Sequence, residues 1–222
     1  MTTTSKYGFK VSIDQCGNFV LPDFADSSEQ SIIDVFEQET LRLKEKNKPR
    51  YSMIEFGAKW AYYSLLFHNI LGKDKVTSIM VEPYLPHLER GKRNFKLNDC
   101  QGIWYNRGIG TIRHCANTIT SVEPILIDEI LKDQSLTEVD CIHCDADGPE
   151  VDMLEENMHW FAEGKVGVVF LLTHDCHGEP KQIHNRCKKF FVPFDYSLIY
   201  EESEIQCGPY HTSDRVLVYR KN

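Results

Sequence analysis

The sequence lacks the long apolar run that a membrane-spanning helix requires. Its 222 residues are 41% hydrophobic and 26% charged, which is typical of a globular protein. No stretch approaches the roughly 20 consecutive apolar residues needed to cross a bilayer. The polar start MTTTSKYGFK also lacks the apolar centre of a secretory signal peptide. We therefore expect a cytoplasmic protein without a membrane span.

An excess of positive charge is also missing. The formal net charge is -8 at pH 7, which disfavours broad affinity for nucleic acid or anionic membranes. A local basic patch remains possible at residues 44–50 and at Arg90, Lys92 and Arg93. The sequence has no internal repeat or low-complexity tract, and its length suits one large α/β domain. Oligomeric state is left open.

Paired cysteines of a secreted protein are not expected either. Eight cysteines in a chain without a secretory signal indicate reduced thiols rather than disulfides. Cys141 and Cys144 have the spacing of a zinc motif, but the segment VDCIHCD around them resembles a strand. Side chains three positions apart on a strand point to opposite faces, so these two thiols would not converge on one metal ion.

Residues 27–48 predict an amphipathic helix, which begins at Ser27 or Ser28 and ends in a basic run broken by Pro49. We assign residues 1–48 to an N-terminal extension whose helix packs on the core, and residues 49–222 to one Rossmann-like domain. A role for the helix as a substrate lid is the alternative. A simple packing helix with a charged outer face is the favoured interpretation.

The stretch from Tyr51 to Ser64 predicts a strand, a tight turn and a helix. Met53-Ile54 leads to Glu55, and Gly57-Ala58 then forms the turn before an apolar helix. Such a turn lies at the carboxyl edge of a parallel sheet, where nucleotide-like ligands bind. With one glycine and an acid, it does not fit a phosphate loop, and the acid favours a positively charged ligand instead. A plain structural turn is the alternative.

Later strand ends also carry polar residues. Glu82 and Pro83 follow the expected strand 76–81. The separation in sequence between Gly57 and Glu82 suits a carboxylate that accepts ribose hydroxyls. Strands are also expected at 103–107, 138–144, 166–173, 196–201 and 215–220, with helices at 85–99, 124–133, 150–163 and 181–191. This order predicts an α/β fold with a Rossmann-like, doubly wound, seven-stranded mixed sheet and an N-terminal helical extension.

Three segments resemble FkbM-type, class I S-adenosylmethionine-dependent methyltransferases: IEFGAKWAYYSL, VEPYLPHLERGKRNFKLND and DCIHCDADGPEVDMLE, the last followed by FLLTHDCHG. The resemblance covers about residues 50–178 and implies S-adenosylmethionine as cofactor. It implies the following cofactor contacts: Glu55, Gly57, Ala58 and Ala61 at the amino-acid end, Glu82 at the ribose, and Asp145 at the methionine moiety or reacting centre. Pro83 beside Glu82, and Arg107 at the end of the third strand toward the adenine side, are expected to complete the cofactor site.

The chain departs from the family pattern within the first turn. Ala61 stands where the family usually has a second glycine, and Lys59-Trp60 replaces smaller polar residues. We expect Lys59 to point to solvent, because its charge would be unfavourable beside a sulfonium. Trp60 either shapes the pocket or turns into the core.

Methyl transfer to an alcohol requires positioning and removal of the acceptor's proton. His174 is the favoured general base, because a free imidazole titrates near neutral pH. Asp175 is either its orienting partner or a substrate ligand, and His177 is the second choice as base. Asp145, His174 and Asp175 could instead hold magnesium or manganese. Asp147 and Glu150 are expected to be turn and helix-cap residues.

We therefore expect an O-methyltransferase for a hydroxyl of a small acceptor, most plausibly a sugar or glycan. The first alternative is methylation of nitrogen or of nucleic acid. The second is a non-catalytic ligand-binding domain on the same fold, because fold alone does not fix function. A different dinucleotide cofactor is disfavoured because the turn lacks the three-glycine spacing.

Overall fold

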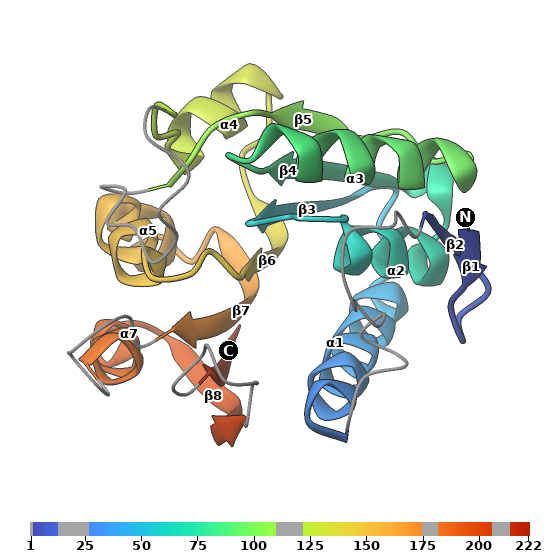
Figure 1. Cartoon of the computed structure of the whole chain (residues 1–222). Helices are drawn as coiled ribbons and strands as arrows, with labels where there is room; N and C mark the ends of the chain where they lie inside the picture. The colour runs from blue at the N-terminus through green and yellow to red at the C-terminus, as the bar shows by residue number, and fades with distance from the viewer. Residues whose placement is uncertain (1, 13–26, 110–121, 175–181, 206–213) are drawn as a thin grey trace.

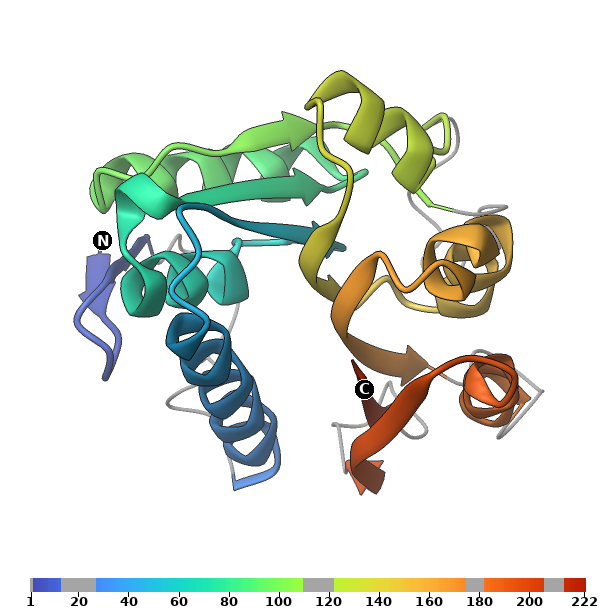
Figure 2. The same cartoon turned by 180° about the vertical axis from the view of Figure 1, so that it is seen from behind.

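A seven-stranded mixed sheet forms the centre of the molecule (Figures 1 and 2). The structure is a computed structural model that describes residues 2–12, 27–109, 122–174, 182–205 and 214–222. The sheet contains β3 (Tyr51–Phe56), β4 (Val76–Val81), β5 (Ile103–Tyr105), β6 (Val139–Cys144), β7 (Val166–His174), β8 (Tyr196–Ile205) and β9 (Asp214–Lys221). The strand order is β5-β4-β3-β6-β7-β9-β8.

The first five strands in this order run parallel, whereas β9 is antiparallel to both β7 and β8. The order reverses direction between β3 and β6, and this is the point at which a doubly wound sheet binds ligands beyond its carboxyl edge. The predicted Rossmann-like seven-stranded mixed sheet is thus confirmed, including the closing pair of strands.

Helices cover both faces of the sheet (Figure 1). Side chains from one face form a hydrophobic core with the first three helices, α1 (Ser27–Glu45), α2 (Tyr62–Leu71) and α3 (Leu85–Leu97). The other face packs against α4 (Ile127–Asp133), α5 (Glu150–Glu156), α6 (Met158–Ala162) and α7 (Gln182–Phe191). Cys141 belongs to the first core and Cys144 to the second, as the alternation of a strand requires.

The N-terminal segment packs on the first face. The Phe36 ring of α1 lies 5.0 Å from those of both Tyr63 and Phe170. A hairpin of β1 (Thr2–Thr4) and β2 (Lys10–Ser12) is bound to α3, because Ser12 N donates a 2.8 Å hydrogen bond to Asn94 Oδ1. The packing helix expected from the sequence is present, and its last turn ends at Glu45. The domain division at residue 48 stays a prediction.

One predicted helix, residues 150–163, is instead two short helices that meet at Asn157. The side chain of Asn157 is buried, donates to Met153 O at 2.7 Å and accepts from Ile127 N at 2.9 Å. Asparagine competes with helical hydrogen bonds in this way, which explains the break. Within the described residues, every helix is too short or too polar to cross a lipid bilayer.

Candidate functional site

Four predicted site residues lie at or just after the ends of strands that run in the same direction. Glu55 lies near the end of β3, Glu82 follows β4, Asp145 follows β6 and His174 ends β7. Because these strands are parallel, all four residues lie at the carboxyl edge of the sheet. Lys59, in the turn that follows β3, contacts both Glu82 and Asp145, and Asp145 lies directly beside His174.

The turn after β3 has an unusual backbone. Positions 57, 59 and 61 all have left-handed φ values, of 68°, 44° and 58°, although only the first is glycine. A Cβ added at Gly57 would lie 1.9 Å from the carbonyl oxygen of Asp145, so the turn crosses directly against the end of β6. The sequence does not reveal these three left-handed positions, because two of them hold Lys59 and Ala61 rather than the glycine that this conformation favours.

Glu82 holds this turn in place. Its carboxylate accepts hydrogen bonds from Lys59 N through Oε2 and from Tyr84 N through Oε1, both at 2.8 Å. Glu82 is 3% exposed, and burial raises its pKa. Asn106 Nδ2 donates to the carbonyls of Glu82 and Pro83, which fixes the chain after β4. Contact of Glu82 or Pro83 with a ribose stays a prediction.

Lys59 does not extend freely into solvent as expected from the sequence. Its ammonium lies 3.0 Å from Asp145 Oδ2, and the side chain is 44% exposed. The charge of Asp145 is the main cause that raises the pKa of Lys59, so the ammonium is charged at neutral pH. The structure therefore corrects the expectation: Lys59 is a partly accessible cation within the candidate site.

Asp145 lies between two cations. Beyond the contact with Lys59, its Oδ1 lies 3.3 Å from His174 Nε2. Burial alone would raise the pKa of Asp145, but the charges of Lys59 and His174 lower it to about 2. The 3.3 Å contact lacks hydrogen-bond geometry, and the buried Oδ1 has no hydrogen-bond partner among the described residues. One buried oxygen of Asp145 is therefore left without a hydrogen-bond donor among the described residues.

Carboxylates surround the His174 ring. Its Nδ1 lies 2.9 Å from Glu150 Oε1, and its Nε2 lies 3.6 Å from Asp147 Oδ1. Burial would lower the pKa of His174, but the hydrogen bond to Glu150 and the charges of Glu150, Asp145 and Asp147 raise it to about 10. At neutral pH the ring is an imidazolium and does not accept a proton in this arrangement, which weighs against the general-base hypothesis.

Glu150 combines the predicted turn role with one that the sequence did not indicate. Its side chain is fully buried, and Oε1 also accepts a 3.1 Å hydrogen bond from Gly148 N. The contact with His174 spans 24 positions and lies between two strand ends. Local spacing gives no signal for such a contact, which explains why sequence reasoning missed it.

Asp145, Asp147 and His174 form a group that could hold a metal ion. Each offers one ligand atom, and these atoms lie within 4.8 Å of one another. The oxygen and nitrogen donors suit a divalent cation such as manganese or magnesium. The predicted ligand set contained Asp175 in place of Asp147. Asp175 and His177 lie outside the described residues.

Glu55 anchors the start of α2. It is 2% exposed and accepts hydrogen bonds from Ser64 N, at 3.1 Å, and from Ser64 Oγ. Burial raises the pKa of Glu55 to about 8, so most of this side chain is protonated at neutral pH. Ala58 and Ala61 are buried in the core beside α2. Their contact with a cofactor stays a prediction.

Arg107 and Trp60 are directed toward neighbouring elements. Arg107 donates to the carbonyls of Glu123, at 3.0 Å, and Pro124, at 2.8 Å. The Arg90 guanidinium of α3 lies 5.2 Å from the centroid of the Trp60 ring. Trp60 packs against the core between the sheet and the first three helices. The structure thus places Trp60 against α3 and leaves the adenine contact of Arg107 as a prediction.

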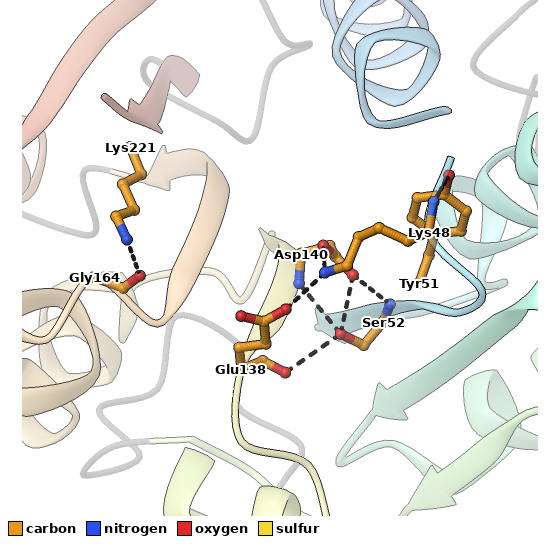
Figure 3. A network of polar contacts seen from close by, with 7 residues as sticks. All are labelled: Lys48, Tyr51, Ser52, Glu138, Asp140, Gly164 and Lys221. Carbon is orange, nitrogen blue, oxygen red and sulfur yellow. Dashed lines mark hydrogen bonds and ion pairs between the residues drawn. The ribbon is translucent and has the colours of Figure 1, made fainter. Parts of the chain in front are cut away.

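The opposite, amino edge of the sheet carries a second polar network (Figure 3). There Asp140 accepts from Lys48 Nζ at 2.8 Å through Oδ1 and from Ser52 N at 2.9 Å through Oδ2. Lys48 also contacts Glu138 at 2.6 Å. Both carboxylate oxygens of Asp140 are therefore occupied by donors from the protein itself.

The strand order and the closing antiparallel pair give the chain the fold of class I S-adenosylmethionine-dependent methyltransferases. Of the solved structures, 373 chains match. One is a precorrin-6y C5,15-methyltransferase from Geobacter metallireducens, with 14% identity and a TM-score of 0.53, covering 89% of this chain and 92% of that one. The METTL16 methyltransferase domain has 12% identity and a TM-score of 0.57, covering 97% and 74%.

A third structure is M. capricolum TrmK in complex with S-adenosylhomocysteine, with 13% identity and a TM-score of 0.52, covering 82% of this chain and 67% of that one. Such low identities show a shared fold alone. No protein-family model matches the sequence. No curated protein matches it either. Membership of the FkbM-type family therefore stays a prediction.

Proposed function

We propose that the protein is an S-adenosylmethionine-dependent methyltransferase. The observation that carries this proposal is the left-handed turn at residues 57–61, which Glu82 holds against Asp145 at the carboxyl edge of a methyltransferase fold. The buried Asp145 Oδ1 lacks a hydrogen-bond partner among the described residues, which fits a site for a ligand ammonium group. Gly57 and Asp145 would hold the amino-acid end of the cofactor, and Glu82 would lie at its ribose.

When bound, the cofactor supplies an electrophilic methyl group on a sulfonium. The protein's contribution is then positioning, because the thioether that leaves is neutral. In the free chain, His174 holds Asp145 and Asp147 in place as an imidazolium. Removal of a proton from the acceptor needs another group or a shifted His174 pKa. Asp175 remains a predicted catalytic residue beside it.

We propose a hydroxyl of a small molecule, sugar or glycan as acceptor. The resemblance to FkbM-type enzymes and the net charge of -8 support this choice over nucleic acid. A mass-spectrometric screen of hydroxylated acceptors with S-adenosylmethionine tests it. A product that is heavier than one of these acceptors by one methylene group identifies that acceptor. Methylation of RNA, with binding that falls steeply with salt, would instead select the nucleic-acid alternative.

Calorimetry with S-adenosylhomocysteine tests the cofactor directly. We expect saturable binding, and a loss of about tenfold or more in affinity for Asp145→Asn, because a carboxylate binds an ammonium more strongly than an amide does. Asp152→Asn on α5 is the matched control and should bind as the wild type does. If neither S-adenosylmethionine nor S-adenosylhomocysteine binds the wild type, the proposal is wrong.

A divalent cation is a second component to test. Asp145, Asp147 and His174 would hold it, His174 after losing its proton, and the ion would lower the pKa of an acceptor hydroxyl. Manganese titration by calorimetry, with Asp147→Asn as the variant, measures binding without reference to turnover. Turnover that EDTA leaves unchanged would remove the metal from the proposal and leave the methyltransferase assignment intact.

A further inference from the structure

Lys59 is an unusual residue for its position. Its backbone is left-handed, with φ 44°, and its N–H is fixed by Glu82. A lysine side chain costs conformational free energy there relative to glycine, so its side chain invites a functional explanation. That side chain lies across the turn and ends 3.0 Å from Asp145 Oδ2. The turn thus carries a cation next to the buried anion of the site.

The ion pair leaves hydrogen-bonding capacity on both partners. A lysine ammonium has three hydrogens, and the described contacts of Lys59 Nζ use one of them, for Asp145 Oδ2. Asp145 Oδ1 is buried and receives no hydrogen bond from the described residues. The Lys59 side chain as a whole is 44% exposed, so this turn is in contact with solvent. A donor with unused hydrogens therefore lies beside an acceptor that receives no hydrogen bond from the described residues.

The amino-acid end of S-adenosylmethionine has the complementary arrangement, a carboxylate beside an ammonium on one carbon. Resting on the proposed function, we propose that Lys59 and Asp145 form a clamp for this zwitterion. Lys59 Nζ binds the carboxylate, and Asp145 Oδ1 binds the ammonium. Lys59 is then a specificity-determining residue that selects cofactors with an intact amino-acid end.

The charges around the site support a clamp over simple competition by Lys59 for the ammonium position. Lys59 and His174 bring two positive charges, whereas Asp145, Asp147 and Glu150 bring three carboxylates. The group keeps a negative excess with Lys59 in place, so a ligand ammonium can approach Asp145. A ligand carboxylate, in contrast, is repelled by the three carboxylates of this group and attracted only by its two cations. Of these two, Lys59 is 44% exposed and His174 is buried.

The test compares two ligands that differ at the amino-acid end. S-adenosylhomocysteine has the zwitterion, whereas 5′-methylthioadenosine has a methyl group in its place. We expect Lys59→Met to weaken S-adenosylhomocysteine by about tenfold or more and to leave 5′-methylthioadenosine within about twofold, both measured by calorimetry. Lys59→Arg should recover most of the affinity. Lys92→Met is the matched control, because Lys92 is 42% exposed and paired with Glu89 on α3.

Each other outcome contradicts the clamp in a distinct way. Tighter S-adenosylhomocysteine binding by Lys59→Met would identify Lys59 as a competitor. Equal losses for both ligands, with an altered thermal unfolding curve, would show that Lys59 only supports the turn. If the wild type binds both ligands and Lys59→Met changes neither affinity, the clamp fails and the proposed function survives. If the wild type binds no adenosyl ligand at all, both fail.

Discussion

Each end of β6 carries an aspartate paired with a lysine, but the two aspartates differ in how many of their oxygens accept hydrogen bonds. Asp140 at the amino edge and Asp145 just past the carboxyl edge each bind a lysine, at 2.8 Å from Lys48 and at 3.0 Å from Lys59. Asp140 also accepts from Ser52, so both its oxygens are occupied (Figure 3). Asp145 retains one buried oxygen without a hydrogen bond in the described structure.

This difference separates a structural ion pair from a candidate binding group. An unsatisfied buried oxygen costs free energy in the free chain, and a ligand donor can recover that cost. Asp140, which already has a donor at each oxygen, gains less from a further donor. The comparison predicts that changes at the amino edge alter stability, whereas changes at the carboxyl edge alter binding, provided that the turn itself is preserved.

The largest effect is expected for Gly57→Ala, which tests whether the carboxyl edge depends on the close crossing of turn and strand. The added Cβ would lie 1.9 Å from Asp145 O, and φ at this position is 68°. We expect the free energy of unfolding to fall by about 3 kcal/mol or more, as measured by urea denaturation. Gly8→Ala is the control, because φ there is 86° and a Cβ added at Gly8 would have no atom of the described residues within 4 Å. Equal losses for both variants would contradict the crossing as cause.

Replacement of each aspartate by alanine tests the difference between the two edges directly. Asp140→Ala leaves the buried Ser52 N–H without its acceptor and should lower the free energy of unfolding by about 2–4 kcal/mol. Asp145→Ala should cost about 1 kcal/mol, because its partner Lys59 is half-exposed. Affinity for S-adenosylhomocysteine should show the reverse order. Similar stability losses would remove the distinction between the two edges.

The third prediction concerns the pH dependence that Glu55 causes. Its pKa rises from 4.5 in the unfolded chain to about 8 in the folded protein, chiefly through burial. The folded state therefore holds this proton more tightly, and stability should fall as pH rises from 4.5 to about 8. Glu55→Gln should remove this dependence. Above pH 8 its free energy of unfolding should exceed that of the wild type by on the order of 2 kcal/mol.

Chemical denaturation at several pH values measures this difference. Glu89→Gln is the control, because Glu89 is exposed on α3 and lies outside the core. A constant difference between Glu55→Gln and the wild type across the whole pH range would show that Glu55 is ionised in the folded protein.

The smallest effect is expected for the two lysines. Lys48→Met should lower the free energy of unfolding by about 1 kcal/mol, because Lys48 bridges Glu138 and the buried Asp140. Lys59→Met should change it by less than about 0.5 kcal/mol, since its side chain is 44% exposed and water screens the pair. Thermal unfolding of both variants resolves the order, and the reverse order would argue that Lys59 is structural.

Periodicity and strand ends were enough to predict the sheet and the edge at which Glu82, Asp145 and His174 lie. These signals are local in sequence, and parallel topology then brings the strand ends together. Side-chain direction was not predictable. Lys59 was expected in solvent because nothing in the sequence shows that its backbone is left-handed, and the pKa of His174 depends on Glu150, which spacing alone cannot place beside it.

Through Phe36, the N-terminal helix α1 packs against residues that support the candidate site. Phe36 contacts Tyr63 and lies 6.2 Å, edge-on, from His143, the partner of Glu55 in the β3–β6 register. Burial lowers the pKa of His143 to about 4, so a neutral imidazole fills this layer beneath the turn. A shortened chain starting at residue 49 would expose that layer to water. Folding and cofactor affinity should then be lost together, however complete the strand-end residues remain.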